Sequence, residues 1–379
     1  MTEPENRRAI WMVDTTLRDG EQAPGVVFST DERLGIASLL ARTGINEIEA
    51  GIPAMGDEAC RDIKKMADLN LPCTLSCWCR ANERDIEQAA RCRTQGVHIS
   101  FPVSSILLKT FDKDEAWVLK SLRSLVGFAK TYFDRVSVGA QDATRTRREF
   151  LHEFAALAHE AGADRLRIAD TVGMSSPSRV TDLVTGLKKQ VSGICLEFHG
   201  HNDLGMATAN AVTAVEAGAD ALSVTVNGLG ERAGNAPLEE AAMALFEIGG
   251  YNGTIDMTRI TDLCSRVAKA SGRAIHPSKP ITGKNVFRHE SGIHCAGLLK
   301  NPSAYQLFQP EQVGKKTCDY VIGYHSGSAG IRHVLENQGI SIGKAPAQKL
   351  IPYVRQMAME RKSPLSPAEL KELYFFVMG

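Results

Sequence analysis

Two histidines lie two residues apart at the end of an apolar run, in the segment LEFHGHND at 196–203. Side chains alternate along a strand, so His199 and His201 project to the same side, separated by about 6.6 Å along the strand. Two imidazoles at that spacing suit one divalent metal ion, whereas a lone histidine is more often an ordinary polar residue. The pair predicts a metal site that a carboxylate from another segment would complete.

A carboxylate and an arginine follow another apolar run, in DTTLRDGEQ at 14–22. Asp19 offers the hard oxygen ligands that such a cation accepts, and Asn235 can add an amide oxygen. The guanidinium of Arg18 stays protonated and suits an oxygen that becomes negative during a reaction. Mg²⁺, Mn²⁺ and Zn²⁺ all fit this mixed oxygen and nitrogen set. The alternative is a solvated Arg18–Asp19 ion pair in a loop, which adds little to stability.

Two glycine-containing segments carry further polar residues. In NGLGERAGN at 227–235 the glycines do not follow the dinucleotide fingerprint G-x-G-x-x-G. We interpret the segment as backbone that approaches a ligand closely, with Glu231, Arg232 and Asn235 facing the site, or as a plain tight turn. In RHESGIHCAG the histidines His289 and His294 lie among glycines. Loop histidines of this kind are proton-transfer candidates, with ordinary surface histidines as the alternative.

The elements that would position these residues follow a repeating pattern in which an Ala-rich helical segment stops at glycine and a β-branched run follows. Four repeats show it, with the glycine expected at the helix C-cap; these glycines are Gly44, Gly96, Gly162 and Gly218. Four more runs bring the number of expected strands to eight; they lie at 10–16, 74–79, 135–139 and 194–199. Eight strand–helix units over about 250 residues predict a TIM (β/α)8 barrel, with a doubly wound open sheet as the alternative.

The repeat ends near residue 252, and the following sequence predicts a different organisation. We expect the barrel to occupy residues 1–271. Residues 272–302, rich in Pro, Gly, Lys and His, predict an irregular linker, and 303–379 predict a small C-terminal helical subdomain. That subdomain is too small to form a strong core alone, so we expect it to pack on the barrel or on a partner subunit.

Composition excludes several classes of function. The 44 basic residues balance the 44 acidic ones, which predicts no binding to nucleic acid or to an anionic membrane surface. No apolar run reaches the roughly 18 residues of a membrane span, and the first residues lack the apolar stretch of a signal peptide. The nine cysteines contain no CxxC pair, so we expect reduced thiols and not a zinc site on Cys73, Cys77 and Cys79. We expect a cytoplasmic protein that acts on small molecules.

The segments named above resemble the metal-dependent acyl-CoA condensing enzymes, a family that includes isopropylmalate, citramalate and homocitrate synthases. The resemblance covers nearly the whole chain. It rests on DTTLRDGEQ at 14–22, EAGIPAMG at 49–56, ADTVG at 169–173, HGHNDLGMATAN at 199–210, NGLGERAGNAPLEE at 227–240, SGIHCAGLLK at 291–300 and HSG at 325–327.

The resemblance implies a role for each matching residue. Asp19, His199 and His201 would bind the metal, Mg²⁺ or Mn²⁺ with Zn²⁺ or Co²⁺ as alternatives, and Asn235 would lie close by. Acetyl-CoA would be the co-substrate, and Arg18 would polarise the keto group of a 2-oxo acid. The remaining roles would be substrate binding by Thr171 and Gln22, and a carboxylate in the site from Glu49.

The resemblance also implies a homodimer in which the linker of one subunit reaches the active site of the other. His294 matches the family's candidate catalytic base, and Tyr305 matches a tyrosine near it. Both would come from the opposite subunit.

Two features favour 2-oxoglutarate as the acceptor and homocitrate as the product. The segments CWCR at 77–80 and FPVS at 101–104 look like the nitrogen-fixation type of homocitrate synthase. The chain also ends soon after the helical subdomain, without the leucine-binding domain usual in isopropylmalate synthases. The distal carboxylate of 2-oxoglutarate needs a cation, and Arg80 at the end of the third strand is the residue we expect to supply it.

Two positions depart from the family pattern. Gln141 stands where the family usually has glutamate before Asp142, and a neutral amide cannot accept a proton. Either Asp142 substitutes, the role is unnecessary, or catalysis is impaired. Tyr324 stands where a lysine usually precedes HSG, and we have no physical account of its effect.

Four alternatives to homocitrate synthesis remain. An isopropylmalate or citramalate synthase would use 2-oxoisovalerate or pyruvate. A hydroxymethylglutaryl-CoA-type lyase shares the barrel, but such lyases look different at the loop NGLGERAGN, which lacks their cysteine. Gln141 motivates the last alternative, a non-catalytic metal-binding homologue.

Overall fold

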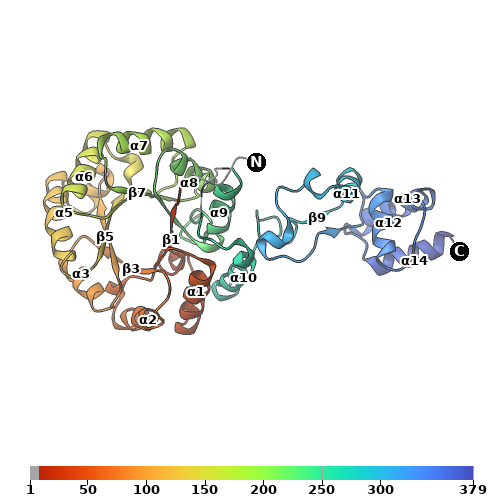
Figure 1. Ribbon diagram of the computed structural model, residues 1–379, viewed down its shortest axis with the longest axis horizontal. Coiled ribbons are helices and arrows are strands. Elements are labelled where there is room, and N and C mark those ends of the chain that lie inside the picture. The colour runs from red at the N-terminus through yellow and green to blue at the C-terminus, as the bar shows by residue number, and fades with distance from the viewer. Residues whose placement is uncertain (1–7, 249–250, 252, 379) are drawn as a thin grey trace. The chain divides into compact units, whose positions relative to one another are not determined.

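The computed structural model describes residues 8–248, 251 and 253–378. The chain divides into two compact units, Met1–Ala274 and Ile275–Gly379. In the first unit eight parallel strands pair in chain order and close into a barrel, with the helices around them (Figure 1). The predicted TIM barrel is confirmed, and the open sheet is excluded because β1 pairs with both β2 and β8.

The strands and helices of the barrel unit alternate along the chain. The strands are β1 Trp11–Asp14, β2 Glu47–Glu49, β3 Thr74–Arg80, β4 Gly96–Pro102, β5 Arg135–Gln141, β6 Arg165–Asp170, β7 Cys195–Gly200 and β8 Ala221–Val224. The helices are α1 Thr30–Thr43, α2 Asp57–Asp68, α3 Glu83–Ala90, α4 Ser105–Thr110, α5 Glu115–Ala129, α6 Arg148–Glu160, α7 Pro177–Gln190, α8 Ala207–Glu216, α9 Leu238–Glu247 and α10 Ile260–Ser271.

Three of the four predicted helix-ending glycines adopt the left-handed backbone that this position requires. Their φ angles are 91° at Gly44, 85° at Gly162 and 116° at Gly218. Gly96 corrects the prediction, because it is the first residue of β4 and Arg93 takes the left-handed turn after α3 with φ 61°. A β-carbon at position 96 would lie 3.3 Å from the Ser76 β-carbon, so the small residue serves close strand packing.

Charged side chains fill the interior of the barrel. Arg165 of β6 lies 2.8 Å from Glu47 and 2.6 Å from Glu197, and Arg167, two residues further on, lies 2.6 Å from Glu197 and 2.9 Å from Glu49. All five side chains are less than one-tenth exposed. Removing one member of such a buried network leaves an uncompensated charge and costs about 3–5 kcal/mol. The apolar residues of the same strands face the helices.

The second unit begins at Ile275, three residues after the start of the range predicted as a linker. A two-stranded parallel sheet joins β9 Arg288–His289 to β10 Asp319–Tyr320. The helices are α11 Gly292–Leu298, α12 Ser328–Glu336, α13 Lys344–Arg361 and α14 Pro367–Met378. Residues of α12, α13 and α14 share an apolar core that includes Ile331, Leu350 and Leu370. Of the helices within the described ranges, none has the length and apolar character that crossing a membrane needs.

Candidate active site

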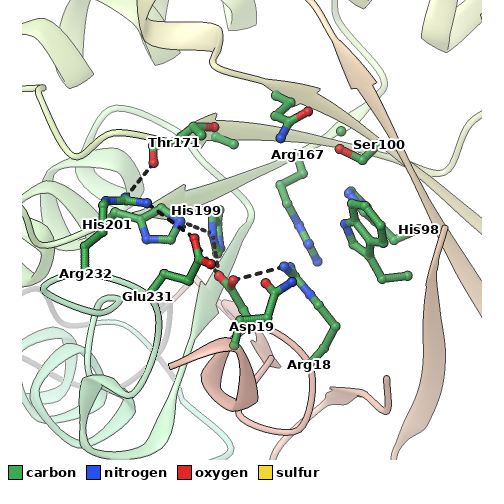
Figure 2. A pocket seen from close by; sticks show the side chains of 15 residues that line it. Arg18, Asp19, His98, Ser100, Arg167, Thr171, His199, His201, Glu231 and Arg232 are labelled. Carbon is green, nitrogen blue, oxygen red and sulfur yellow. Dashed lines mark hydrogen bonds and ion pairs between the residues drawn. The ribbon is translucent and has the colours of Figure 1, made fainter. Parts of the chain in front are cut away.

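The barrel gathers Asp19, His199 and His201 at the C-terminal ends of β1 and β7. Asp19 follows β1 in a tight turn, His199 belongs to β7, and His201 comes just after that strand. Oδ2 of Asp19 lies 3.1 Å from Nε2 of His199 and 3.8 Å from Nε2 of His201. The two histidine Nε2 atoms are 3.1 Å apart, so the three ligand atoms converge on one point (Figure 2).

The hydrogen bonding around these residues fits a divalent cation. Within the described residues, Oδ2 of Asp19 is buried and makes no hydrogen bond. Nδ1 of His199 lies 2.9 Å from the Ser223 hydroxyl, which orients the ring and leaves Nε2 facing the cluster. Second partners of this kind are typical of metal-bound histidines. A buried carboxylate oxygen without a hydrogen bond is costly, and a bound cation would satisfy it.

Electrostatics hold the cluster in the protonation state that binds metal. Burial raises the pKa of Asp19, but the guanidinium of Arg18 and the two histidines outweigh it, and the pKa lies well below its usual range. Burial, with the charge of His199 next, lowers the pKa of His201 to about 4. At neutral pH the cluster therefore offers a carboxylate and a neutral imidazole, both ready ligands.

Asn235 lies beside His201 but outside the three-ligand cluster. The two residues form an isolated antiparallel bridge. The Asn235 side chain donates from Nδ2 to the Leu229 carbonyl at 3.0 Å, and its Oδ1 is buried without a hydrogen-bond partner among the described residues. The loop before it is tightly closed, since a β-carbon at Gly234 would lie 1.9 Å from the Gly228 carbonyl oxygen. Metal ligation by Asn235 stays a prediction.

Arg18 is held beside the cluster from two sides. Its Nη1 lies 3.2 Å from Oδ1 of Asp19, and its Nε donates to Oε2 of Glu49. Its guanidinium lies 5.7 Å from the centre of the Trp78 ring, within cation–π range. Glu49 is fully buried and also accepts from the Thr15 hydroxyl at 2.8 Å. Burial raises the pKa of Glu49, but Arg167 and Arg18 hold it well below its usual range.

Glu49 lies outside the residues that line the cavity. It contacts Arg18 and Arg167 and positions both guanidinium groups. The prediction that Glu49 is a catalytic carboxylate of the site is corrected in this respect, because its oxygens are engaged with the two arginines and Thr15.

A cavity of about 220 Å³ opens beside the cluster of Asp19, His199 and His201. Pockets that enclose drug-sized ligands are roughly 300–1,000 Å³, so this one suits a small acid and not a whole coenzyme. It brings together the predicted residues Arg18, Asp19, Gln22, Thr171, His199 and His201. It also contains residues that the prediction missed, from strands β3, β4 and β6; these are Trp78, His98, Ser100 and Arg167. Their signal in the sequence was the alternation of polar and apolar residues in these strands.

Thr171 lies at the wall of the cavity. Its hydroxyl accepts from the Asp142 backbone N–H at 2.8 Å, which leaves its own O–H to donate toward the cavity. Its backbone carbonyl accepts from Arg232, which also pairs with Asp203 at 2.7 Å.

Arg80 corrects the prediction, because it does not line the cavity. Its side chain is 66% exposed and forms a two-point ion pair with Asp85, at 2.8 and 2.9 Å. Asp85 is buried in the first turn of α3 and also accepts from the backbone N–H of Arg80. This local pair turns the guanidinium away, and the distal carboxylate of an acceptor needs another partner.

Gln141 lines the cavity, whereas Asp142 does not. The carboxylate of Asp142 is buried and accepts from the Ser104 hydroxyl at 2.5 Å and from Arg145 at 2.8 Å. Both oxygens are occupied by these partners, which disfavours the interpretation that Asp142 substitutes for the missing glutamate.

The second unit brings His294 and Tyr305 together. Their rings stack with centroids 4.2 Å apart, and both side chains are exposed. The segments GIH and HSG also meet, because the backbone N–H of Gly292 donates to the His325 carbonyl at 3.0 Å. A β-carbon at Gly292 would lie 2.9 Å from Gly327, so this approach requires glycine.

Residues 9–267 match the family described as HMGL-like. The chain belongs to the HMGL-like family. Residues 281–362 of this HMGL-like chain match a second family, described as homocitrate synthase post-HMGL domain-like. The HMG-CoA lyase of Bacillus subtilis shares the fold, with a TM-score of 0.63 at 20% identity over 74% of this chain and 98% of that one.

Three relatives of this HMGL-like chain match it over nearly its whole length. The 2-isopropylmalate synthase 2 of Caldanaerobacter subterraneus is 46% identical over 97% of this chain and 95% of its own. Homocitrate synthase 1 of Nostoc is 43% identical over 95% of each chain. The 2-phosphonomethylmalate synthase of Streptomyces rubellomurinus is 39% identical over 97% of this chain and 98% of its own. The relatives place the chain among acetyl-CoA-condensing synthases without selecting one acceptor.

His98 and Asp14 are both buried, and we expect pH to change the free energy of unfolding in opposite directions through them. Burial, followed by the charge of Arg167, holds the pKa of His98 well below its ordinary value. Below pH 6.5 the unfolded chain therefore binds a proton that the folded chain does not, and acid destabilises the fold. Burial raises the pKa of Asp14 to about 7, so between pH 4 and 7 the folded chain holds a proton that the unfolded chain releases, and rising pH destabilises the fold.

We expect His98→Gln to remove about 1.4 kcal/mol per pH unit from the slope of unfolding free energy between pH 5 and 6, and Asp14→Asn to add about as much. Urea unfolding in buffer with a chelator measures both slopes. The two variants shifting the slope in the same direction would contradict the assignment.

Proposed function

We propose that this chain condenses acetyl-CoA with 2-oxoglutarate and water, giving homocitrate and CoA, as the nitrogen-fixation type of homocitrate synthase does. The observation that carries the proposal is the buried cluster of Asp19, His199 and His201 beside Arg18 in a cavity of about 220 Å³. Relatives named homocitrate synthase, at 43% identity, support this acceptor. We also propose a cytoplasmic location, in which cysteine thiols stay reduced.

The residues around the cavity match the charges that such a reaction develops. A bound divalent cation would orient the 2-oxo acid and polarise its keto group. Thr171 and Gln22 line the cavity where they would bind the carboxylate beside that keto group. The methyl group of acetyl-CoA loses a proton, its carbon bonds to the keto carbon, and the keto oxygen becomes negative. Arg18, which lines the cavity beside the cluster, would stabilise that oxygen until it takes up a proton. Water then cleaves the thioester to give the carboxylate and free CoA.

We propose that His294 is the base that takes the methyl proton and that it comes from the partner subunit of a homodimer, together with Tyr305. Stacking on Tyr305 holds the imidazole in one orientation, and exposure of both rings on their own unit leaves them free to face a partner. Histidine bases of this kind work well near neutral pH.

Thiol release from acetyl-CoA tests the proposed function, with Mg²⁺ or Mn²⁺ and one of four acceptors: 2-oxoglutarate, 2-oxoisovalerate, pyruvate or oxaloacetate. We expect kcat/KM to be highest with 2-oxoglutarate. Preference for 2-oxoisovalerate would instead support an isopropylmalate synthase, which the relative at 46% identity favours. Preference for pyruvate would support a citramalate synthase. No thiol release with any of the four acceptors would support a non-catalytic homologue, with Gln141 as the residue to examine.

A further inference from the structure

We propose that Arg167 of β6 binds the distal carboxylate of the acceptor and so makes the enzyme selective for 2-oxo dicarboxylic acids. The inference rests on the proposed function. Arg167 would bind the distal carboxylate, which Arg80 was predicted to bind. Arg167 lines the same cavity as the metal ligands and is 3% exposed (Figure 2).

The guanidinium of Arg167 has an unused donor. Its Nε donates to Glu197 at 2.6 Å, and its Nη1 lies 2.9 Å from Glu49. Within the described residues its Nη2 is buried and makes no hydrogen bond. A buried charged group with an unmet donor is costly, and a ligand carboxylate is the partner that a guanidinium binds best. The two glutamates hold the side chain in place without occupying this nitrogen.

The cavity wall next to Arg167 carries neutral polar groups. Gly139 pairs in register with Arg167, and a β-carbon there would lie 2.5 Å from Nε2 of His98. Glycine at this position therefore makes room for the imidazole, whose Nδ1 lies 3.0 Å from the Ser137 hydroxyl. Ser100 lines the same wall. The only carboxylates that contact Arg167 in the described structure, Glu49 and Glu197, are already in ion pairs with Arg18 and Arg165 respectively.

Strand register places Arg167 deeper in the barrel than the metal ligands. Ala169 pairs with His199, and Arg167 is two residues before Ala169 on the same inward face. That is a step of about 6.6 Å along the strand, toward its N-terminal end. An acid whose keto group lies at the level of His199 can direct its remaining carbons inward, toward Arg167. An apolar tail in that position would leave the Nη2 donor of Arg167 without a hydrogen bond, which disfavours such an acid.

The test compares Arg167→Lys with Arg165→Lys. Lysine keeps a positive charge between the glutamates but has no nitrogen at the position of Nη2. Arg165 is the matched control, since it lies on the same strand, forms the same kind of ion pairs and does not line the cavity. We expect Arg167→Lys to raise KM for 2-oxoglutarate by about 10- to 100-fold and to change KM for pyruvate by less than about 3-fold. Arg165→Lys should change neither value by more than about 3-fold, because lysine keeps the charge and residue 165 does not line the cavity.

Binding gives a readout that does not depend on turnover. Titration calorimetry with Mn²⁺ present compares 2-oxoglutarate with 5-methyl-2-oxohexanoate, in which an isopropyl group replaces the distal carboxylate. Wild type should prefer the dicarboxylate, and Arg167→Lys should lose most of that preference. Urea unfolding of both variants shows whether the fold is kept.

Three outcomes overturn the role of Arg167: an unchanged KM for 2-oxoglutarate in Arg167→Lys, an equal loss with pyruvate, or no preference for the dicarboxylate by wild type. A wild type that binds 2-oxoglutarate through Arg167 but releases no thiol would support the role of Arg167 and overturn the proposed function. The two failures are therefore distinguishable.

Discussion

Asp19→Asn is expected to weaken Mn²⁺ binding by more than 100-fold and to lower kcat/KM for condensation by at least about 10³-fold. Losing an outer partner of a metal ligand already costs roughly 10- to 100-fold in affinity, and Asp19 supplies a ligand atom itself. The carboxylate also lies 3.2 Å from Arg18, so its charge helps to hold that guanidinium beside the cavity. Asparagine keeps the shape of the side chain and removes only the charge and one oxygen.

Competition with a chromophoric chelator measures the Mn²⁺ affinity of this variant. Asp203→Asn is the control, because Asp203 is a nearby carboxylate whose partner is Arg232 and which lies outside the cluster. We expect the control to bind Mn²⁺ within a few-fold of wild type. Unchanged Mn²⁺ affinity in Asp19→Asn would contradict the metal site.

His294→Asn is expected to lower kcat by about 10²- to 10⁴-fold, the usual contribution of a general base. KM for 2-oxoglutarate should change little, since the acceptor would lie among barrel residues. The exposed histidine His276 of the same unit provides the control, and His276→Asn should retain wild-type kcat.

Mixing two inactive variants tests whether a partner subunit supplies the base. Co-expression of Asp19→Asn and His294→Asn chains with different affinity tags gives mixed dimers. If sites combine two subunits, each mixed dimer has one site with both defects and one with neither, so a random mixture should regain about a quarter of wild-type activity. Recovery that stays at the level of the separate variants would contradict the exchange of residues between subunits.

The metal cluster is the part of the site that the sequence determined most directly. The spacing of His199 and His201 places both rings on one side of β7, because covalent geometry alternates side chains along any strand. Asp19 follows β1, and in a closed parallel barrel all such ends meet at one face. The helix–glycine–strand repeat in turn predicted the barrel, because the local sequence of each repeat indicates where its helix ends and its strand begins.

Arg80 and Arg167 show what only the tertiary structure decided. Both are arginines on strands of the barrel, and the local sequence pattern does not indicate which carboxylate each one pairs with. A long flexible side chain goes to the nearest good partner, which for Arg80 is Asp85 at the rim of the barrel. For Arg167 the partners Glu49 and Glu197 come from strands distant in sequence, so its place depends on closure of the barrel.

The inward direction of Arg167 also reverses the usual sequence pattern. In β6 every residue is buried, with Arg165 and Arg167 on one face and Leu166 and Ile168 on the other. Ordinary alternation assigns the charged face to solvent, but here the apolar face packs on helices and the charged face fills the barrel. The sequence by itself determined the strands, the repeat and the metal-ligand spacing, which depend on local geometry. The tertiary structure decided which buried face lines the cavity and which ion pairs form, because those depend on partners far apart in the chain.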